Sequence, residues 1–393
     1  MFKNPTEIYL FVLLGIFIIP YLIWRFVKTD SYAPLPVIQI IVGIFFGPGI
    51  FGYFFPGSYE TLFTPDTVKM LSGVATLAVI LFVFTAGLEV NIKEAWTEKK
   101  DSLTTSFFAL ITPLILGSVL AYFISFDKKW LGPQAHEWQF ILSVGMAMAV
   151  TALPILVLLL EKMSILKSDI GVRCLRYASF DDILIWTVFA LILLDWNRLV
   201  RQGVFFLLFI AVSYLISKFS YKIPEKDRVH FSIFWLILCA YASDWAGLHY
   251  LVGGFLAGFI LSEEWIGKDT LNNLRKYVLL LIMPVFFLST GLKTDWQLTD
   301  LSVVCLAFAL FICQAIGKIL GVSISAKILR WPSRDARIIG WLLQTKALIE
   351  IIFCTVMLDK GIISAEMFTA LLFMAILSTV STTPVVSRML KNK

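Results

Sequence analysis

Long hydrophobic runs separated by short polar stretches recur from one end of the chain to the other. An α-helix needs about 20 consecutive apolar residues to cross about 30 Å of hydrocarbon, and most of these runs approach that length. We therefore predict an all-α polytopic membrane protein with thirteen transmembrane helices, the seventh being the shortest. The predicted segments are 7–27, 32–54, 67–90, 102–125, 138–160, 170–194, 203–217, 229–246, 248–264, 272–292, 301–326, 338–358 and 365–387.

Composition supports the same fold class. Of the 393 residues, 59% are hydrophobic and 15% are charged, and the mean hydropathy is +0.85. A soluble chain of this length could not bury so much apolar surface. Because the predicted loops are short and few residues follow the last run, we expect a single membrane domain over residues 1–393, with no C-terminal regulatory domain.

Basic residues near the helix ends predict which side of the membrane each loop faces, because cytoplasmic loops are enriched in Lys and Arg. With the N-terminus outside and the C-terminus inside, 22 of the 33 Lys and Arg residues fall on the inner side and eight on the outer side. A single miscounted helix would assign every later loop to the opposite side of the membrane and erase this difference, so the bias also supports thirteen helices. The three other basic residues, Arg176, Lys318 and Lys346, fall within predicted helices.

Three short motifs in the first half of the chain have weak echoes, in the same order, in the second half. The pairs are 42–47 with 252–257, 84–89 with 288–293, and 151–154 with 345–348. The members of each pair lie seven helices apart, and because seven is odd the second copy runs in the opposite direction through the membrane. The sequence thus predicts two inverted repeats, an architecture typical of secondary transporters.

Two adjacent carboxylates, Asp181 and Asp182, lie near the middle of the sixth hydrophobic run. A carboxylate at this depth costs several kcal/mol, so it is rarely retained without a function or a partner. Successive helical residues point about 100° apart, so one Asp can face an ion cavity while the other faces a partner within the protein. The alternative is a pair of structural acids at a helix break, although the run stays apolar for about three turns on each side.

Thr151 and Pro154 predict an interruption of the fifth helix. Proline removes one helical hydrogen bond and clashes with the preceding turn, which frees backbone groups. In transporters, unwound backbone at the membrane centre offers carbonyl oxygens and helix dipoles to ions. An ordinary proline kink is the alternative interpretation.

The corresponding part of the twelfth helix favours the interruption. Gln344, Thr345, Lys346 and Glu350 place four polar side chains at the centre of an apolar run. Lys346 and Glu350 are four residues apart and can pair along one helix face. We expect two broken helices to cross here, with this cation and anion offsetting the opposed helix dipoles.

Lys318 lies inside the eleventh helix, about two and a half turns before Lys327. One interpretation is that its ammonium snorkels to the membrane interface. The other is an ion pair with Asp181 or Asp182. A buried lysine gives up its proton readily, so such a pair could exchange protons and metal ions near neutral pH.

The sequence contains no nucleotide-binding, metal-hydrolase or nucleophile motif, and its five cysteines lack the spacing of a metal site. We therefore expect no enzymatic activity, no cofactor and no nucleic-acid partner.

Over nearly its whole length the chain resembles the monovalent cation:proton antiporter-2 family, including its bacterial sodium/proton antiporters and the plant cation/proton exchanger branch. Segment 151–157 is similar to the family's threonine–proline broken helix. Asp181 and Asp182 resemble the double aspartate of electrogenic members, in which the first acid pairs with a lysine and the second binds the ion. Lys318 falls where that lysine lies, and segment 345–350 resembles the Thr-Lys/Arg-Gly-Leu-x-Glu signature of the exchanger branch.

This resemblance implies a role for each candidate residue. Asp182, with Asp181 and Thr151, would bind the monovalent cation or the proton, and Lys318 would couple proton release to cation entry. The broken-helix crossing would be formed by Pro154, Thr345, Lys346 and Glu350. Ala347 departs from the family pattern, which has glycine there, and is expected to stiffen or shift the break.

With this resemblance we expect a secondary active transporter that exchanges Na⁺, K⁺ or Li⁺ for protons by elevator-type alternating access in the plasma (bacterial inner) membrane, and the resemblance to double-aspartate members implies that the exchange is electrogenic. We expect a homodimer with panel helices in 1–100 and 229–293, an ion-transporting core in 101–195 and 301–388, and a linker helix in 196–228. A channel-like K⁺ efflux pathway and a non-transporting sensor with the antiporter fold are the alternatives. The retained intramembrane charges count against the sensor.

Overall fold

A computed structural model of the chain describes residues 4–29, 33–89, 98–194, 198–219, 223–294, 301–346 and 348–391. Apart from one isolated antiparallel bridge between Leu131 and Ile363, the regular structure of these residues is helical. The first half contains α1 (Pro5–Phe26), α2 (Leu35–Phe45), α3 (Pro56–Leu62), α4 (Pro65–Glu89), α6 (Lys99–Ile124), α7 (Glu137–Ala149), α8 (Leu153–Lys162), α9 (Asp169–Ile192) and α10 (Leu199–Phe219).

The second half continues in the same way. It contains α11 (Arg228–Trp245), α12 (Tyr250–Ile266), α13 (Lys268–Tyr277), α14 (Met283–Gly291), α15 (Leu301–Leu329), α16 (Ser333–Leu343), α17 (Leu348–Asp359) and α18 (Ala365–Lys391). Two short π-helices, Pro48–Gly52 and Val278–Ile282, follow α2 and precede α14.

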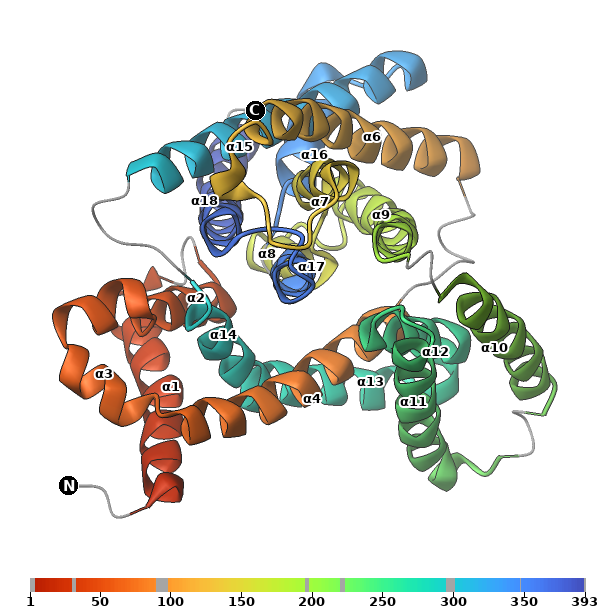
Figure 1. Cartoon of the computed structure of the whole chain (residues 1–393). Coiled ribbons are helices and arrows are strands. Elements are labelled where there is room, and N and C mark those ends of the chain that lie inside the picture. The colour runs from red at the N-terminus through yellow and green to blue at the C-terminus, as the bar shows by residue number, and fades with distance from the viewer. Residues whose placement is uncertain are drawn as a thin grey trace. The chain divides into compact units, whose positions relative to one another are not determined.

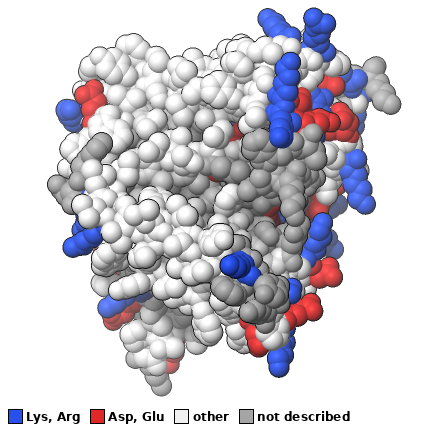
Figure 2. Space-filling view, turned by 90° about the vertical axis from the view of Figure 1, so that its right-hand side faces the viewer, with Lys and Arg blue, Asp and Glu red and all other residues white. Residues whose placement is uncertain are grey.

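Each hydrophobic run predicted from the sequence lies on one helix or on consecutive helices. Within the described ranges, nine helical segments are long and apolar enough to cross a membrane, and the bent pair α16–α17 would make a tenth. Most side chains on the face drawn in Figure 2 are uncharged. The chain is thus an all-helical, multi-pass membrane protein. Thirteen crossings and an outside N-terminus stay predictions.

Two helices bear on the assignment of the membrane spans. The predicted seventh segment, 203–217, is too short, because α10 extends over 21 residues. Helix α9 is 24 residues long, but Arg173, Arg176, Asp181 and Asp182 lower its apolar character. Its place in the membrane therefore depends on how these charges are neutralised.

Proline residues explain where several helices begin. Proline lacks an N–H group and has a fixed φ, so it fits the first turn of a helix, where that N–H has no intrahelical partner. Helices α1, α2 and α8 each have proline in their first two positions. In α1 the preceding Asn4 also caps the helix, its Oδ1 accepting from Glu7 N at 2.8 Å.

The chain divides into two compact units. The first contains Met1–Val74, Ala95–Ile185 and Pro284–Lys393, and the second contains Ala75–Glu94 and Trp186–Met283. In the first unit α7, α8 and α17 lie at the centre, with α6, α9, α15, α16 and α18 around them (Figure 1). A buried hydrophobic cluster fills this region, with members such as Leu156, Leu160, Tyr177, Ile339 and Leu343.

Helix α15 approaches α6 closely in the first unit because two glycines leave room for backbone contact. A Cβ atom at Gly317 would lie 2.7 Å from Pro113 Cα. One turn later, a Cβ at Gly321 would collide with the Phe108 carbonyl. Because Lys318 follows Gly317 directly, this close contact fixes the position from which the lysine extends.

Glycines in the repeated motifs, or directly next to them, meet in a reciprocal pattern within each unit. In the first unit a Cβ at Gly291 of α14 would collide with the backbone of Gly43 of α2. In the second unit a Cβ at Gly258 of α12 would collide with α4 next to Gly87, and the reverse also holds. Motif 42–47 thus contacts 288–293, the second-half copy of motif 84–89, and motif 84–89 contacts the end of the second-half copy of motif 42–47. Two repeats related by a two-fold axis would produce this arrangement.

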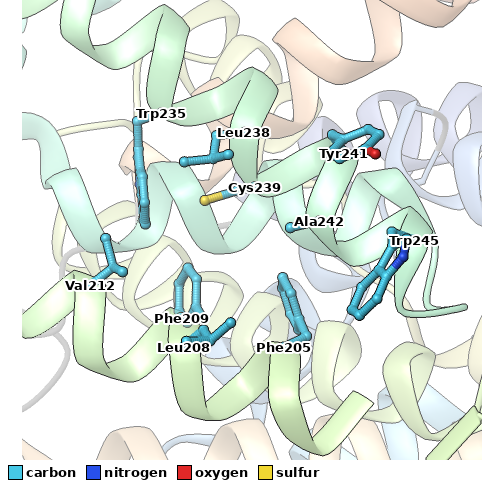
Figure 3. A pocket seen from close by; sticks show the side chains of 10 residues that line it. All are labelled: Phe205, Leu208, Phe209, Val212, Trp235, Leu238, Cys239, Tyr241, Ala242 and Trp245. Carbon is cyan, nitrogen blue, oxygen red and sulfur yellow. The ribbon is translucent and has the colours of Figure 1, made fainter. Parts of the chain in front are cut away.

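The second unit carries an apolar groove between α10 and α11 (Figure 3). Its volume is about 420 Å³. The buried Phe205, Trp235 and Cys239 form its floor beside the partly buried Phe209, and the small Cys239 side chain leaves space between the aromatic rings. Since the groove is lined almost wholly by carbon, it offers no ligands to an ion, and the polar residues of interest lie in the first unit.

Candidate functional site

The first helix break separates α7 from α8. Residues 150–152 lie outside both helices, and α8 begins at Leu153 with Pro154 in its first turn. The missing N–H of Pro154 prevents α7 from continuing as one helix, as the sequence predicted. Thr151 and Ala152 are fully buried, so their polar groups need partners inside the protein.

The second break separates α16 from α17, and these two helices are bent by 47°. Gln344, Thr345 and Lys346 lie outside the helices and are all buried, while Ala347 lies outside the described residues. The expectation that Ala347 stiffens the break therefore stays a prediction.

The two breaks are joined by their backbones. Ala152 N donates to the Thr345 carbonyl oxygen at 2.8 Å. The Thr151 hydroxyl lies 2.7 Å from the Leu343 carbonyl oxygen, to which it donates. The Thr345 hydroxyl instead donates to the Leu342 carbonyl in the last turn of α16, at 2.6 Å. Groups freed by one interruption are therefore satisfied by the other.

Lys318 of α15 and Asp181 of α9 meet at the first break. The Lys318 ammonium lies 3.3 Å from Asp181 Oδ2 and donates to Thr151 Oγ1 at 2.8 Å. Thr151 Oγ1 is also 3.0 Å from Asp181 Oδ2. All three side chains are completely buried. Lys318 therefore does not snorkel, and the second interpretation of this residue describes the structure.

Asp182 lies beside this cluster and is also buried, with 1% of its surface exposed. Its negative charge attracts the Lys318 ammonium. Helix α9 thus places two carboxyl groups near one ammonium. With both carboxyl groups ionised, the cluster has one negative charge in excess, which a further positive charge would neutralise. A proton or a monovalent cation can supply that charge.

Lys346 stabilises the end of α7. Its ammonium donates to the carbonyl oxygens of Ala147 and Val150, the latter at 3.1 Å, and lies 3.5 Å from Glu350 Oε2. Unpaired carbonyl groups give a helix C-terminus a partial negative charge, so a cation is stabilised there. Glu350 lies in the first turn of α17, where an anion is favoured for the opposite reason.

Sequence reasoning missed the residues that hold the second break from α15 and α18. Gln314 Nε2 lies 3.3 Å from the Gln344 carbonyl oxygen, and Ser378 Oγ donates to the same oxygen at 2.6 Å. Thr379 Oγ1 accepts from Lys346 N at 3.1 Å. The spacing of Gln314 and Lys318, one turn apart in an apolar helix, is the signal that could have pointed to the first of these.

A second charged cluster explains Arg176, which the sequence placed within the sixth helix. Its guanidinium donates to Glu98 at 2.8 Å and to Asp101 at 3.2 Å. Asp101 also accepts from the Tyr177 hydroxyl at 2.6 Å. Tyr177 lies one helical turn before Asp181. This cluster ties the start of α6 to α9, the helix that carries the two aspartates.

Three comparisons show which known proteins the chain is similar to. A family model described as "Sodium/hydrogen exchanger, transmembrane" matches residues 12–391. The chain is 29% identical to the Na(+)/H(+) antiporter NhaS4 of Synechocystis sp., covering 89% of this chain and 90% of that protein. It is also 29% identical to the K(+)/H(+) antiporter 1 of Saccharomyces cerevisiae, covering 89% of this chain but 43% of the yeast protein.

The fold is similar to a solved structure of the sodium proton antiporter MjNhaP1 from Methanocaldococcus jannaschii. The TM-score is 0.62, and the match covers 99% of each chain at 12% sequence identity. At this identity the similarity concerns the fold alone.

Proposed function

The chain belongs to the sodium/hydrogen exchanger family, and we propose that it is a secondary transporter that exchanges a monovalent cation for protons across the membrane. Na⁺, K⁺ and Li⁺ are the candidate cations, since the relatives include proteins named for Na⁺ and for K⁺. The observation that carries the proposal is the buried cluster of Asp181, Asp182, Lys318 and Thr151 beside two joined helix breaks.

In the proposed cycle, Asp182 holds either a proton or the cation. When the cation enters, its charge competes with the Lys318 ammonium for Asp181, so the ion pair opens and Lys318 releases its proton. The hydroxyl and carbonyl oxygens of Thr151 offer neutral ligands, and oxygen ligands suit hard cations. One cation thus replaces protons from Asp182 and Lys318, which makes the exchange of two protons for one cation electrogenic.

Coupling follows from the cost of moving bare charge. An empty site with two bare carboxylates is expensive to carry through the low-dielectric part of the membrane, whereas the protonated site is neutral and the cation-loaded site keeps only one negative charge. Only the loaded states should therefore exchange between the two sides. No nucleotide hydrolysis is needed, because the concentration gradient of the protons can drive the cation, and that of the cation can drive the protons.

The joined breaks suit a moving core. We infer that the broken helices cross, and that residues 101–195 and 301–388 move as an elevator against a panel of residues 1–100 and 229–293. In this proposal residues 196–228 connect the halves, the N-terminus lies outside, and two chains form a homodimer in the plasma (bacterial inner) membrane. The reciprocal contacts of Gly43 with Gly291 and of Gly87 with Gly258 support the inverted repeats on which this motion depends.

Two alternatives are less well supported. A channel-like K⁺ pathway has no need for a lysine paired with the ion-binding acids, and a non-transporting sensor has no need to keep such charges buried. The family match also favours exchange over both.

Proteoliposomes with an imposed pH gradient and a pH-sensitive dye test the proposal. We expect Na⁺, K⁺ or Li⁺, but not choline, to relax the gradient. Cation flux that persists without a proton gradient would favour the channel. Well-folded protein that moves no proton in response to any of these cations would contradict exchange.

A further inference from the structure

Helix α15 contacts both helix breaks through two side chains that lie one turn apart. Lys318 reaches the first break, donating to Thr151 Oγ1 at 2.8 Å. Gln314 reaches the second, where its Nε2 lies 3.3 Å from the Gln344 carbonyl oxygen. Residues four positions apart share a helix face, so both side chains extend from the same side of α15. Both are completely buried.

The orientation of the Gln314 amide follows from its partners. The Ser378 hydroxyl donates its one hydrogen to the Gln344 carbonyl at 2.6 Å, so its oxygen faces Gln314 as an acceptor. Gln314 Nε2 is 3.3 Å from that oxygen and 3.3 Å from the Gln344 carbonyl. Because both neighbouring atoms, Ser378 Oγ and the Gln344 carbonyl oxygen, are acceptors, the NH₂ group of the Gln314 amide must face them. The contact is therefore a specific one that only a donor can make.

These contacts close a ring. From Lys318 the ring passes to the Thr151 hydroxyl, then to the Leu343 carbonyl, and then along one peptide unit to Gln344. Gln314 binds Gln344 and returns the ring to α15. Because Gln344 and Leu343 are neighbours, a shift of one carbonyl moves the other. The position of the Thr151 hydroxyl beside Asp181 thus depends on how α15 holds the end of α16.

We propose that Gln314 is a positioning residue that sets the affinity of the cation site by fixing the Gln344 carbonyl. It touches neither the cation nor the exchanging proton. If Lys318 leaves Thr151 together with Asp181 during exchange, α15 loses the contact with the first break that Lys318 makes. Gln314 then keeps the end of α16, and with it Thr151, in place for the incoming cation. This inference rests on the proposed exchange function.

The test compares Gln314→Met with Gln39→Met in proteoliposomes. Methionine is close to glutamine in length but cannot donate a hydrogen bond. Gln39 is also a mostly buried glutamine of the first unit and lies in α2. We expect Gln314→Met to raise the cation KM about two- to tenfold, the range that one hydrogen bond supplies, with kcat changed less than about twofold. Gln39→Met should leave both within about twofold of wild type.

A double-mutant cycle with Ser378→Ala adds a readout that packing alone would not move. Both residues hold the same carbonyl, so the effect of Gln314→Met on KM should be larger when Ser378 is already alanine. Additive effects, or an unchanged KM in well-folded Gln314→Met, would overturn the inference while wild-type exchange still stands. Absence of exchange in wild-type protein would instead contradict the proposed function itself.

Discussion

Ala152 donates its backbone N–H to the carbonyl of Thr345 at 2.8 Å and so joins two helix breaks from opposite halves of the chain. This bond lies beside Thr151, whose hydroxyl contacts both Lys318 and Asp181. A change in the charge of the Lys318–Asp181 pair can therefore act directly on the backbone of both breaks. The predictions below follow from this link between charge and backbone.

Asp182→Asn should abolish cation-dependent proton movement. The amide is similar in size but carries no negative charge, so neither a cation nor a proton is bound. We expect a loss of at least about 100-fold in dye dequenching, corresponding to about 3 kcal/mol or more. Asp227→Asn, at an exposed position, is the matched control and should be unaffected. Normal exchange by Asp182→Asn would rule out its role.

Lys318→Gln should remove one of the two exchanging protons. The expected result is exchange that is electroneutral or whose pH profile is shifted, because glutamine cannot release a proton. Currents on a supported membrane measure this. Lys327→Gln, on the exposed end of the same helix, is the control. Wild-type current from Lys318→Gln at every pH would refute the role of Lys318.

Thr151→Val should raise the cation KM by about tenfold, since it removes a hydroxyl that Lys318 and Asp181 contact and leaves the Leu343 carbonyl without this donor. Thr151→Ser keeps the hydroxyl and should stay close to wild type. Thr369→Val is a matched control, because Thr369 is buried and its hydroxyl donates to the Ala365 carbonyl of its own helix. If Thr151→Val and Thr369→Val give the same KM, Thr151 is not a ligand.

Proton and cation should compete in exchange. If both bind Asp182, each unit of falling pH should raise the apparent cation KM on the acid side by up to about tenfold for each proton that the cation displaces, while the maximal rate changes little. Initial rates at several cation concentrations and pH values measure this dependence. A KM that is constant while the maximal rate falls would mean that the proton acts elsewhere.

The Lys346–Glu350 pair should contribute mainly to stability. Lys346→Met leaves Glu350 buried without its cation and removes the donor to the α7 carbonyls, so we expect destabilisation of about 3–5 kcal/mol. The double variant Lys346→Met/Glu350→Gln removes both charges and should lose less than the sum of the single variants. Thermal unfolding in detergent measures this, and strictly additive losses would contradict the pairing.

Local sequence features predicted part of this site well. Pro154 has no N–H, so an interruption near it did not depend on tertiary contacts. Carboxylates as costly as Asp181 and Asp182 could be recognised from their position in an apolar run alone. The partner of Lys346 was predicted only in part. The spacing suggested Glu350, but contact with the carbonyls of Ala147 and Val150 joins residues far apart in the sequence.

The hydrophobic runs by themselves determined that this protein is an all-helical membrane protein, because backbone groups in hydrocarbon must be satisfied within each segment. They also located the charged residues that such an environment makes expensive. Only the tertiary structure decided which of these residues meet. Lys318 extends toward Thr151 because Gly317 lets α15 approach α6, and Gln314 binds Gln344 because the two breaks are joined. Such contacts depend on the packing of distant helices, and no local pattern in the sequence encodes them.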